Sequence, residues 1–143
     1  LKDLEKDLSK LGLFRQKAKF IKKTAKIIDE KYAGKIPNSM KELIELPGVG
    51  RKTANIILGR LYDKVVGIAV DTHVTRLSRL FGLTNNNDPN KIEQDLMKIL
   101  PKKEWLDFTN RMIAYGRTYC KASCKHKDCP LNHFIVSTPI PYR

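Results

Sequence analysis

The sequence LPGVGRKTAN, residues 46–55, decides how the surrounding chain folds. Pro47 and Gly48 predict a tight turn, and Gly50 allows the backbone to approach another molecule closely. A helix is predicted to begin near Arg51, directly after this glycine-rich turn. The first amides of a helix have no partner within it, and such amides form a ready binding site for a phosphate group.

The residues on both sides extend this turn into a helix–hairpin–helix unit over about 39–62. Upstream, Ser39 and Glu42 have the spacing of a capping box, so a short helix is expected there. Arg51 and Lys52 place two cations beside the free amides, which favours binding of a nucleic-acid backbone over a turn without a ligand. Downstream, apolar residues recur with the period of one helix face: Ala54, Ile57, Leu58, Leu61 and Tyr62.

The composition indicates a polyanionic partner. The chain of 143 residues carries 28 lysines and arginines against 15 acids, a formal net charge of +13. Basic residues gather without any acid in residues 15–26 and 116–127. The length suffices for one domain with a hydrophobic core, or for two small lobes. Because no apolar run could span a bilayer and no signal peptide is present, we expect a soluble intracellular protein, cytoplasmic in a prokaryote or nuclear in a eukaryote.

The three cysteines, Cys120, Cys124 and Cys129, lie within ten residues of one another. Such crowding favours a metal or cluster site, or plain reduced thiols, over a framework of disulfides. A protein that uses an iron–sulfur cluster or zinc to bind a partner is therefore one of the possible functions, and it rests on these cysteines alone.

Helical periodicity covers most of the chain, and the predicted fold is all-α. Residues 65–70 are apolar throughout, but no second strand is present to pair with them, so we expect a buried extended connection. Asp71 is expected to cap the helix after this connection. We divide the chain into a helical lobe over 1–115 and a cysteine-containing loop and tail over 116–143, with an extended segment at 138–141. The other expected helices span about 1–11, 14–32, 89–100 and 103–115, the last closed by Gly116.

Lys52 and Asp71 have the chemistry of a reaction site. Lys52 lies in the first turn of its helix beside Arg51, and both the helix dipole and the neighbouring charge favour the neutral amine. A neutral lysine amine forms a Schiff base with a sugar aldehyde, and the alternative is a lysine that only contacts a phosphate. Asp71 is suited to cap a helix, and also to stabilise a cation on a sugar or to exchange a proton with the amine.

LPGVGRKTAN, followed by VDTHVTRL at 70–77 and AYGRTYC at 114–120, resembles the endonuclease III branch of the helix–hairpin–helix DNA glycosylases. The resemblance runs from Leu11 to Cys120 and implies a partial helical barrel with a C-terminal cysteine loop. In that family the lysine after the hairpin is the nucleophile, and the aspartate of VDTH is the second catalytic residue. These roles fall on Lys52 and Asp71, and the lysine favours the branch that also cuts the strand.

The resemblance implies a base-excision repair enzyme, a DNA N-glycosylase with AP-lyase activity on oxidised pyrimidines and abasic sites in double-stranded DNA. The base is extruded from the duplex, the lysine displaces it, and β-elimination cuts the strand 3′ to the lesion. This chemistry needs no cofactor. The alternatives are a lyase that acts on abasic sites only and a non-catalytic DNA-binding module. The expected DNA contacts are Gly48, Val49, Gly50, Arg51, Thr53, His73 and Arg117.

The cysteine segment departs from the family pattern, which is a loop of four cysteines around an iron–sulfur cluster. Cys120 matches the first ligand and Cys129 the third, while Cys124 is out of register. The second position falls near His126 if one residue is deleted, and the fourth falls near Ile135. Three thiolates with His126 or His133 are a donor set for a [4Fe–4S] cluster or for zinc, and the alternative is a loop without metal.

The other departure lies at the start of the chain. Members of the family usually begin with further helices, which complete the barrel and fill the gap left by the flipped base. Here the sequence starts after them, so we expect that they were removed, or that a complementing chain or self-association supplies them. The face formed by Leu4, Leu8 and Leu11 then needs a partner.

Overall fold

The computed structural model describes residues 1–135, and these contain helices but no strand, which confirms the all-α prediction. No helix within this range is long and apolar enough to cross a membrane. The extended segment expected at 138–141 lies outside the described residues. The helices are α1 (Lys2–Asp7), α2 (Phe14–Tyr32), α3 (Met40–Ile44), α4 (Arg51–Leu61), α5 (Thr72–Leu80), α6 (Pro89–Ile99) and α7 (Trp105–Thr118), with 3₁₀ turns η1 (Lys102–Glu104) and η2 (Asn132–Phe134).

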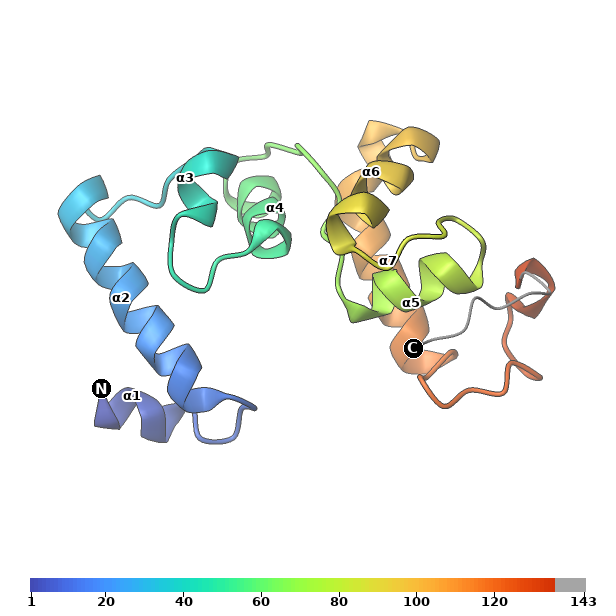
Figure 1. Cartoon of the computed structure of the whole chain (residues 1–143), viewed down its shortest axis with the longest axis horizontal. Coiled ribbons are helices and arrows are strands. Elements are labelled where there is room, and N and C mark those ends of the chain that lie inside the picture. The colour runs from blue at the N-terminus through green and yellow to red at the C-terminus, as the bar shows by residue number, and fades with distance from the viewer. Residues whose placement is uncertain (136–143) are drawn as a thin grey trace.

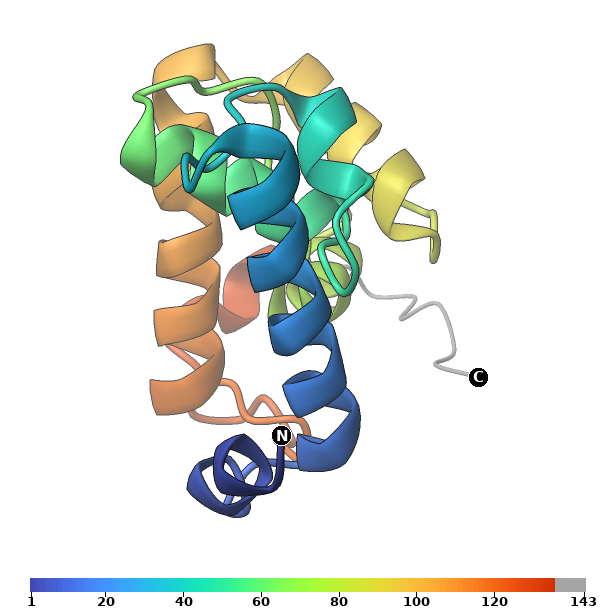
Figure 2. The ribbon, with the colours of Figure 1, turned by 90° about the vertical axis from the view of Figure 1, so that its left-hand side faces the viewer.

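The helices form two groups that meet near the hairpin. In Figure 1, α1 and α2 lie on one side, α5 to α7 and the cysteine segment (residues 119–135) lie on the other, and α3 and α4 stand between them. Figure 2 looks from the α2 side and shows α2 in front with α7 behind. The helix–hairpin–helix unit, α3 to α4, therefore joins the two groups.

Side-chain caps start three of these helices, and two of the caps, Ser39 and Asp71, are the ones that the sequence analysis predicts. The Ser39 hydroxyl accepts a hydrogen bond of 3.3 Å from the Glu42 amide at the start of α3. Asp71 accepts one of 2.8 Å from the Val74 amide at the start of α5. Asp88 accepts two from the first turn of α6, whose first residue is a proline. Each such cap contributes about 1 kcal/mol and fixes where its helix begins.

A first hydrophobic cluster holds the hairpin against α2. The Thr24 hydroxyl donates a hydrogen bond of 2.8 Å to the Pro47 carbonyl. Gly48 has φ 78°, and a Cβ there would lie 2.8 Å from the Phe20 ring, so both the turn and the packing require glycine. Leu61 is 58% exposed, so the prediction that it faces inward is wrong; it is the last residue of α4 and lies beyond the cluster. The buried members are Leu43, Leu46, Ala54 and Leu58.

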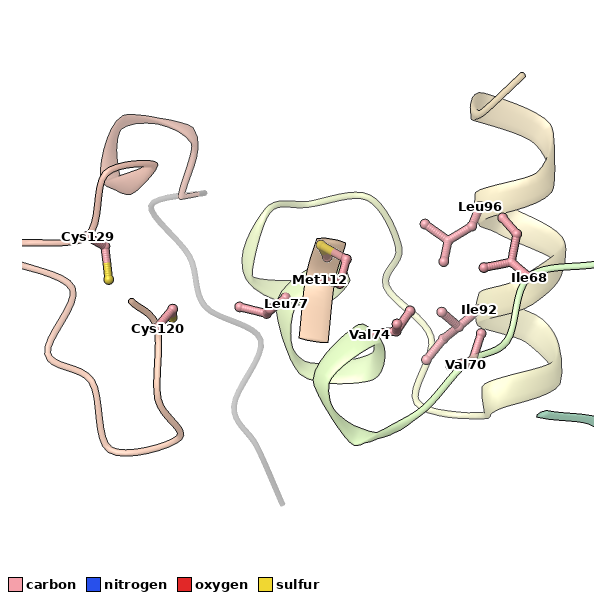
Figure 3. Packing of buried hydrophobic residues seen from close by; sticks show 9 residues of the cluster. All are labelled: Ile68, Val70, Val74, Leu77, Ile92, Leu96, Met112, Cys120 and Cys129. Carbon is pink, nitrogen blue, oxygen red and sulfur yellow. The ribbon is translucent and has the colours of Figure 1, made fainter. Parts of the chain in front are cut away.

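A second cluster joins α5, α6, α7 and the cysteine segment (Figure 3). The connection between α4 and α5 is extended and is buried from Gly67 to Val70, which confirms that part of the prediction, whereas Val66 is 44% exposed. The Thr109 hydroxyl of α7 donates a hydrogen bond of 2.7 Å to the Ala69 carbonyl and ties the connection to α7. The buried members are Ile68, Val70, Val74, Leu77, Ile92, Leu96, Met112, Cys120 and Cys129.

Helix α7 continues through Gly116 to Thr118, so the prediction that Gly116 closes it is wrong. Gly116 is buried, and a Cβ there would lie 2.5 Å from Nδ1 of His73 on α5. Glycine is required here because two helices approach closely, not because the chain must turn. The predicted boundary between 115 and 116 falls inside α7, and the division into lobes stays a prediction.

The region of α1 and α2 presents apolar side chains to solvent on the side that faces the hairpin. Leu11 is 47% exposed and Ile21 is 48% exposed, whereas Leu4 and Leu8 are half-buried. A shallow groove of about 390 Å³ runs between these residues and the hairpin at Gly48. No segment within residues 1–135 covers the groove, so a complementing chain or a second copy stays a prediction.

Candidate functional site

Lys52 lies at an open helix N-terminus. Gly50 is the N-cap residue of α4, and no side chain caps the helix. A Cβ at Gly50 would find nothing within 4 Å, so no other part of the described chain packs against this residue. Lys52 is exposed, and within residues 1–135 its amine makes neither a hydrogen bond nor an ion pair. The amine and the helix amides are thus both open to a ligand.

A small cavity of about 90 Å³ connects Lys52 to the segment that leads to Asp71. Its wall includes Lys52, Thr109 of α7 and Ala69 of the extended connection. Asp71 follows Ala69 by two residues, so its backbone lies within about 7 Å of this wall. The fold therefore brings both predicted catalytic residues to the same region.

Asp71 combines a capping role with an unused oxygen. Its Oδ1 accepts the 2.8 Å hydrogen bond from the Val74 amide, and the residue is half-buried. Within the described chain, its Oδ2 accepts no hydrogen bond, and the carboxylate is not paired with Lys52. A carboxylate held rigidly by one oxygen is suited to stabilise a positive charge at the other.

A buried polar network sets the orientation of the first turn of α4. Glu93 of α6 is only 2% exposed, and it accepts hydrogen bonds from Arg51 Nε and, at 2.8 Å, from Asn55 Nδ2. The Asn55 amide also donates to the Ile68 carbonyl at 3.3 Å. Arg51 is predicted to contact DNA, and the structure gives its guanidinium a partner inside the protein. Positioning the turn that carries Lys52 is thus a role of Arg51, Asn55 and Glu93.

Sequence reasoning misses Glu93, although a signal for it is present. On α6 it is adjacent to Ile92 and three residues before Leu96, so it lies on the apolar side of an amphipathic helix. Acids are almost never fully buried unless they are paired, so this position indicates a partner in the core.

Replacing Gly67 by alanine is expected to disrupt this network. A Cβ at Gly67 would lie 2.0 Å from Glu93 Oε1 and 3.0 Å from the Asn55 amide, so the buried carboxylate must move away from its donors. We expect a loss of about 2–4 kcal/mol in the free energy of unfolding, measured by urea denaturation. Gly12→Ala is the matched control, because nothing lies within 4 Å of a Cβ there, and it should change stability by less than about 1 kcal/mol. Equal stability of the two variants would contradict the network.

The other residues predicted to contact DNA lie in three places. Val49 and Thr53, both half-buried, flank Gly50 at the start of α4. His73 is half-buried against Gly116, a position that gives it a packing role between α5 and α7. Arg117 is exposed in the last turn of α7. Contact of these residues with DNA stays a prediction.

The three cysteines converge with one histidine. The donor atoms of Cys120, Cys124, His126 and Cys129 all lie within 4.8 Å of one another, which is an arrangement able to hold a metal ion. The hydrogen bond between the thiols of Cys124 and Cys129, 3.1 Å long, lowers the pKa of Cys124 and raises the pKa of Cys129 to about 11. His133 instead stacks on Phe134 in η2 and lies outside the group.

Comparison with known proteins relates the chain to proteins of DNA repair. The profile of the HhH-GPD superfamily of base excision DNA repair proteins matches residues 1–102. Endonuclease III of Synechocystis sp. is 44% identical over 138 residues, which cover 94% of this chain and 62% of that protein. The chain thus spans about three fifths of the length of this curated relative.

Two solved structures of endonuclease III bound to DNA share the fold. One is a non-covalent complex and the other is a trapped covalent intermediate, an estranged-adenine complex. Each is 43% identical to this chain and superposes with a TM-score of 0.86 over 94% of it, which corresponds to 63% of the solved chain.

Proposed function

The chain belongs to the HhH-GPD superfamily of base excision DNA repair proteins, and from that premise we propose that it is a DNA N-glycosylase with AP-lyase activity. The observation that carries the proposal is the exposed amine of Lys52, which lies at an uncapped helix N-terminus on the wall of a cavity. The similarity to endonuclease III supports the same function. We assign oxidised pyrimidines and abasic sites in double-stranded DNA as the substrates.

The glycosylase step joins Lys52 to the sugar. The Nζ atom attacks C1′ of the extruded nucleotide, the C1′–N bond breaks, and its electron pair leaves with the damaged base. Positive charge develops on the sugar as this bond breaks, and the Asp71 carboxylate stabilises that charge. The amine loses its proton, the sugar ring opens, and a Schiff base links Lys52 to C1′.

The lyase step follows from the electronics of the Schiff base. The iminium group withdraws electrons and makes the C2′ proton acidic. Loss of this proton forms a double bond between C2′ and C3′, and the C3′–O bond breaks with the 3′ phosphate as leaving group. Water then hydrolyses the imine and releases Lys52. Carboxylates and bound water are the groups able to accept the C2′ proton.

We assign the contacts with the DNA backbone to the start of α4 and to exposed basic side chains. The amides that follow Gly50 are the ones suited to a phosphate, because no side chain caps them and the helix dipole favours an anion. The amide that follows Gly48, that of Val49, already donates a hydrogen bond of 3.0 Å to the Leu46 carbonyl. The exposed lysines of α2 and Arg117 add contacts to the backbone that carry no sequence information. Because these contacts are all with phosphates, we expect DNA binding that weakens as the salt concentration rises and does not depend on the DNA sequence.

Borohydride trapping tests the proposal with the full chain. Two duplexes are compared, one with a single abasic site and one with a single oxidised pyrimidine, each labelled at the 5′ end. We expect a covalent adduct and strand cleavage 3′ to the lesion on both duplexes. An adduct on the abasic duplex alone would replace the proposal with an AP lyase. Salt-sensitive binding without any adduct would replace it with a non-catalytic binding module.

A further inference from the structure

The cysteine segment, residues 119–135, contains a donor set that differs from the one implied by the family. A [4Fe–4S] cluster is held by four cysteine thiolates, one on each iron. Among the described residues, the group at this place consists of three cysteines and His126. Ile135, where the fourth cysteine is expected, offers no donor atom. The donor set therefore does not fit the cluster.

The spacing of the donor atoms leads to the same conclusion. The four ligands of a cubane bind four different irons at separate corners, so their donor atoms surround the whole cluster. Here all four donor atoms lie within 4.8 Å of one another, a space suited to one ion. For a tetrahedral zinc ion, bond lengths of about 2.3 Å to sulfur and about 2.0 Å to nitrogen place sulfurs about 3.8 Å apart and a sulfur and a nitrogen about 3.5 Å apart.

The sulfur–nitrogen distances in the structure are close to this single-ion geometry, whereas the sulfur–sulfur distance between Cys124 and Cys129 is shorter. Nδ1 of His126 lies 3.6 Å from Cys120 Sγ and 3.9 Å from Cys129 Sγ. Cys124 Sγ lies 3.1 Å from Cys129 Sγ. Cys124 belongs to this group although it is out of register with the family pattern. We propose that Cys120, Cys124, His126 and Cys129 form a tetrahedral Cys₃His site for one structural zinc ion in place of an iron–sulfur cluster.

The surroundings of the sulfurs support thiolate ligands. Arg76 Nη1 donates a hydrogen bond of 3.4 Å to Cys120 Sγ, and the His126 amide donates one of 3.3 Å to Cys124 Sγ. Such donors to ligand atoms are typical of metal sites, where they orient the ligands. His126 has φ 61°, a conformation that costs a residue with a side chain free energy, and it turns the imidazole toward the sulfurs.

The site connects the cysteine segment to the second hydrophobic cluster. Cys120 follows α7 almost directly, and Cys129 lies beside it at one end of the cluster in Figure 3. Both are buried, and Arg76 links Cys120 to α5. One zinc ion would thus add to the apolar packing that links this segment to α5 and α7.

Metal analysis of the full chain tests the proposal without reference to activity. The protein is produced in medium that contains both iron and zinc, and zinc, iron and acid-labile sulfide are measured per chain. We expect one zinc and no sulfide. Replacement of the metal by Co²⁺ is expected to give the intense visible bands of a tetrahedral thiolate complex. Iron with matching sulfide would overturn the proposal. A chain without metal, in which all three thiols react immediately with a thiol reagent, would overturn it as well.

Substitutions then identify the ligands. His126→Asn and Cys124→Ser are expected to weaken Co²⁺ binding at least about 10-fold. His133→Asn is the matched control in the same segment and should bind Co²⁺ like the parent chain. Unchanged binding by the Cys124→Ser variant would overturn the assignment of this residue. Because the metal content of the parent chain is measured first, a variant that fails to fold does not decide the test.

Discussion

Replacing Lys52 by glutamine is expected to abolish the borohydride adduct and to lower base release and strand cleavage by more than about 10³-fold. The amine is the only group of this side chain able to form the Schiff base. Lys52 is exposed and unpaired within residues 1–135, so the free energy of unfolding should change by less than about 0.5 kcal/mol. Trapping, cleavage kinetics and urea denaturation measure the three quantities.

Two further variants separate nucleophilic attack from phosphate contact. Lys52→Arg keeps the positive charge but has no amine able to form an imine, so it should bind abasic duplex normally and give no adduct. Lys41→Gln is the matched control, because Lys41 is exposed and is likewise the second residue of its helix, α3. It should retain the adduct and the cleavage rate. Cleavage by Lys52→Arg at the parent rate would contradict the nucleophilic role.

Local signals in the sequence predict the starts of α3, α5 and α6 correctly because the physics of a cap is local. Ser39, Asp71 and Asp88 each bond to amides two or three residues away, so their effect is visible in the sequence. Helix ends that depend on other helices are harder to predict. Gly116 looks like a stop signal, yet it lies inside α7, where the close approach of His73 from α5 requires a glycine.

The candidate site is likewise predictable only in part. The position of Lys52 follows from the glycine-rich turn before it, which is a local pattern. Its supporting network is non-local: Glu93 is 42 residues from Arg51 and 38 from Asn55, and no spacing rule connects them. The same holds for the cysteines, whose grouping with His126 instead of His133 depends on the path of a loop.

Replacing Asp71 by asparagine is expected to lower the rate of base release by about 10² or more while leaving the fold intact. Asparagine caps a helix as well as aspartate does, so the hydrogen bond from the Val74 amide is kept and only the charge is lost. Base release should suffer more than cleavage at a preformed abasic site, because only the first reaction breaks the C1′–N bond. Single-turnover rates on the two duplexes measure this difference.

Asp71→Ala distinguishes this catalytic effect from the capping role. It removes the cap as well as the charge, and should lose about 1 kcal/mol of stability relative to the asparagine variant. If Asp71 served only as a cap, the asparagine variant would keep the parent rate and the alanine variant alone would lose activity, in step with its stability. If the rate of base release instead falls strongly and equally in both variants while their stabilities differ, the rate depends on the carboxylate charge.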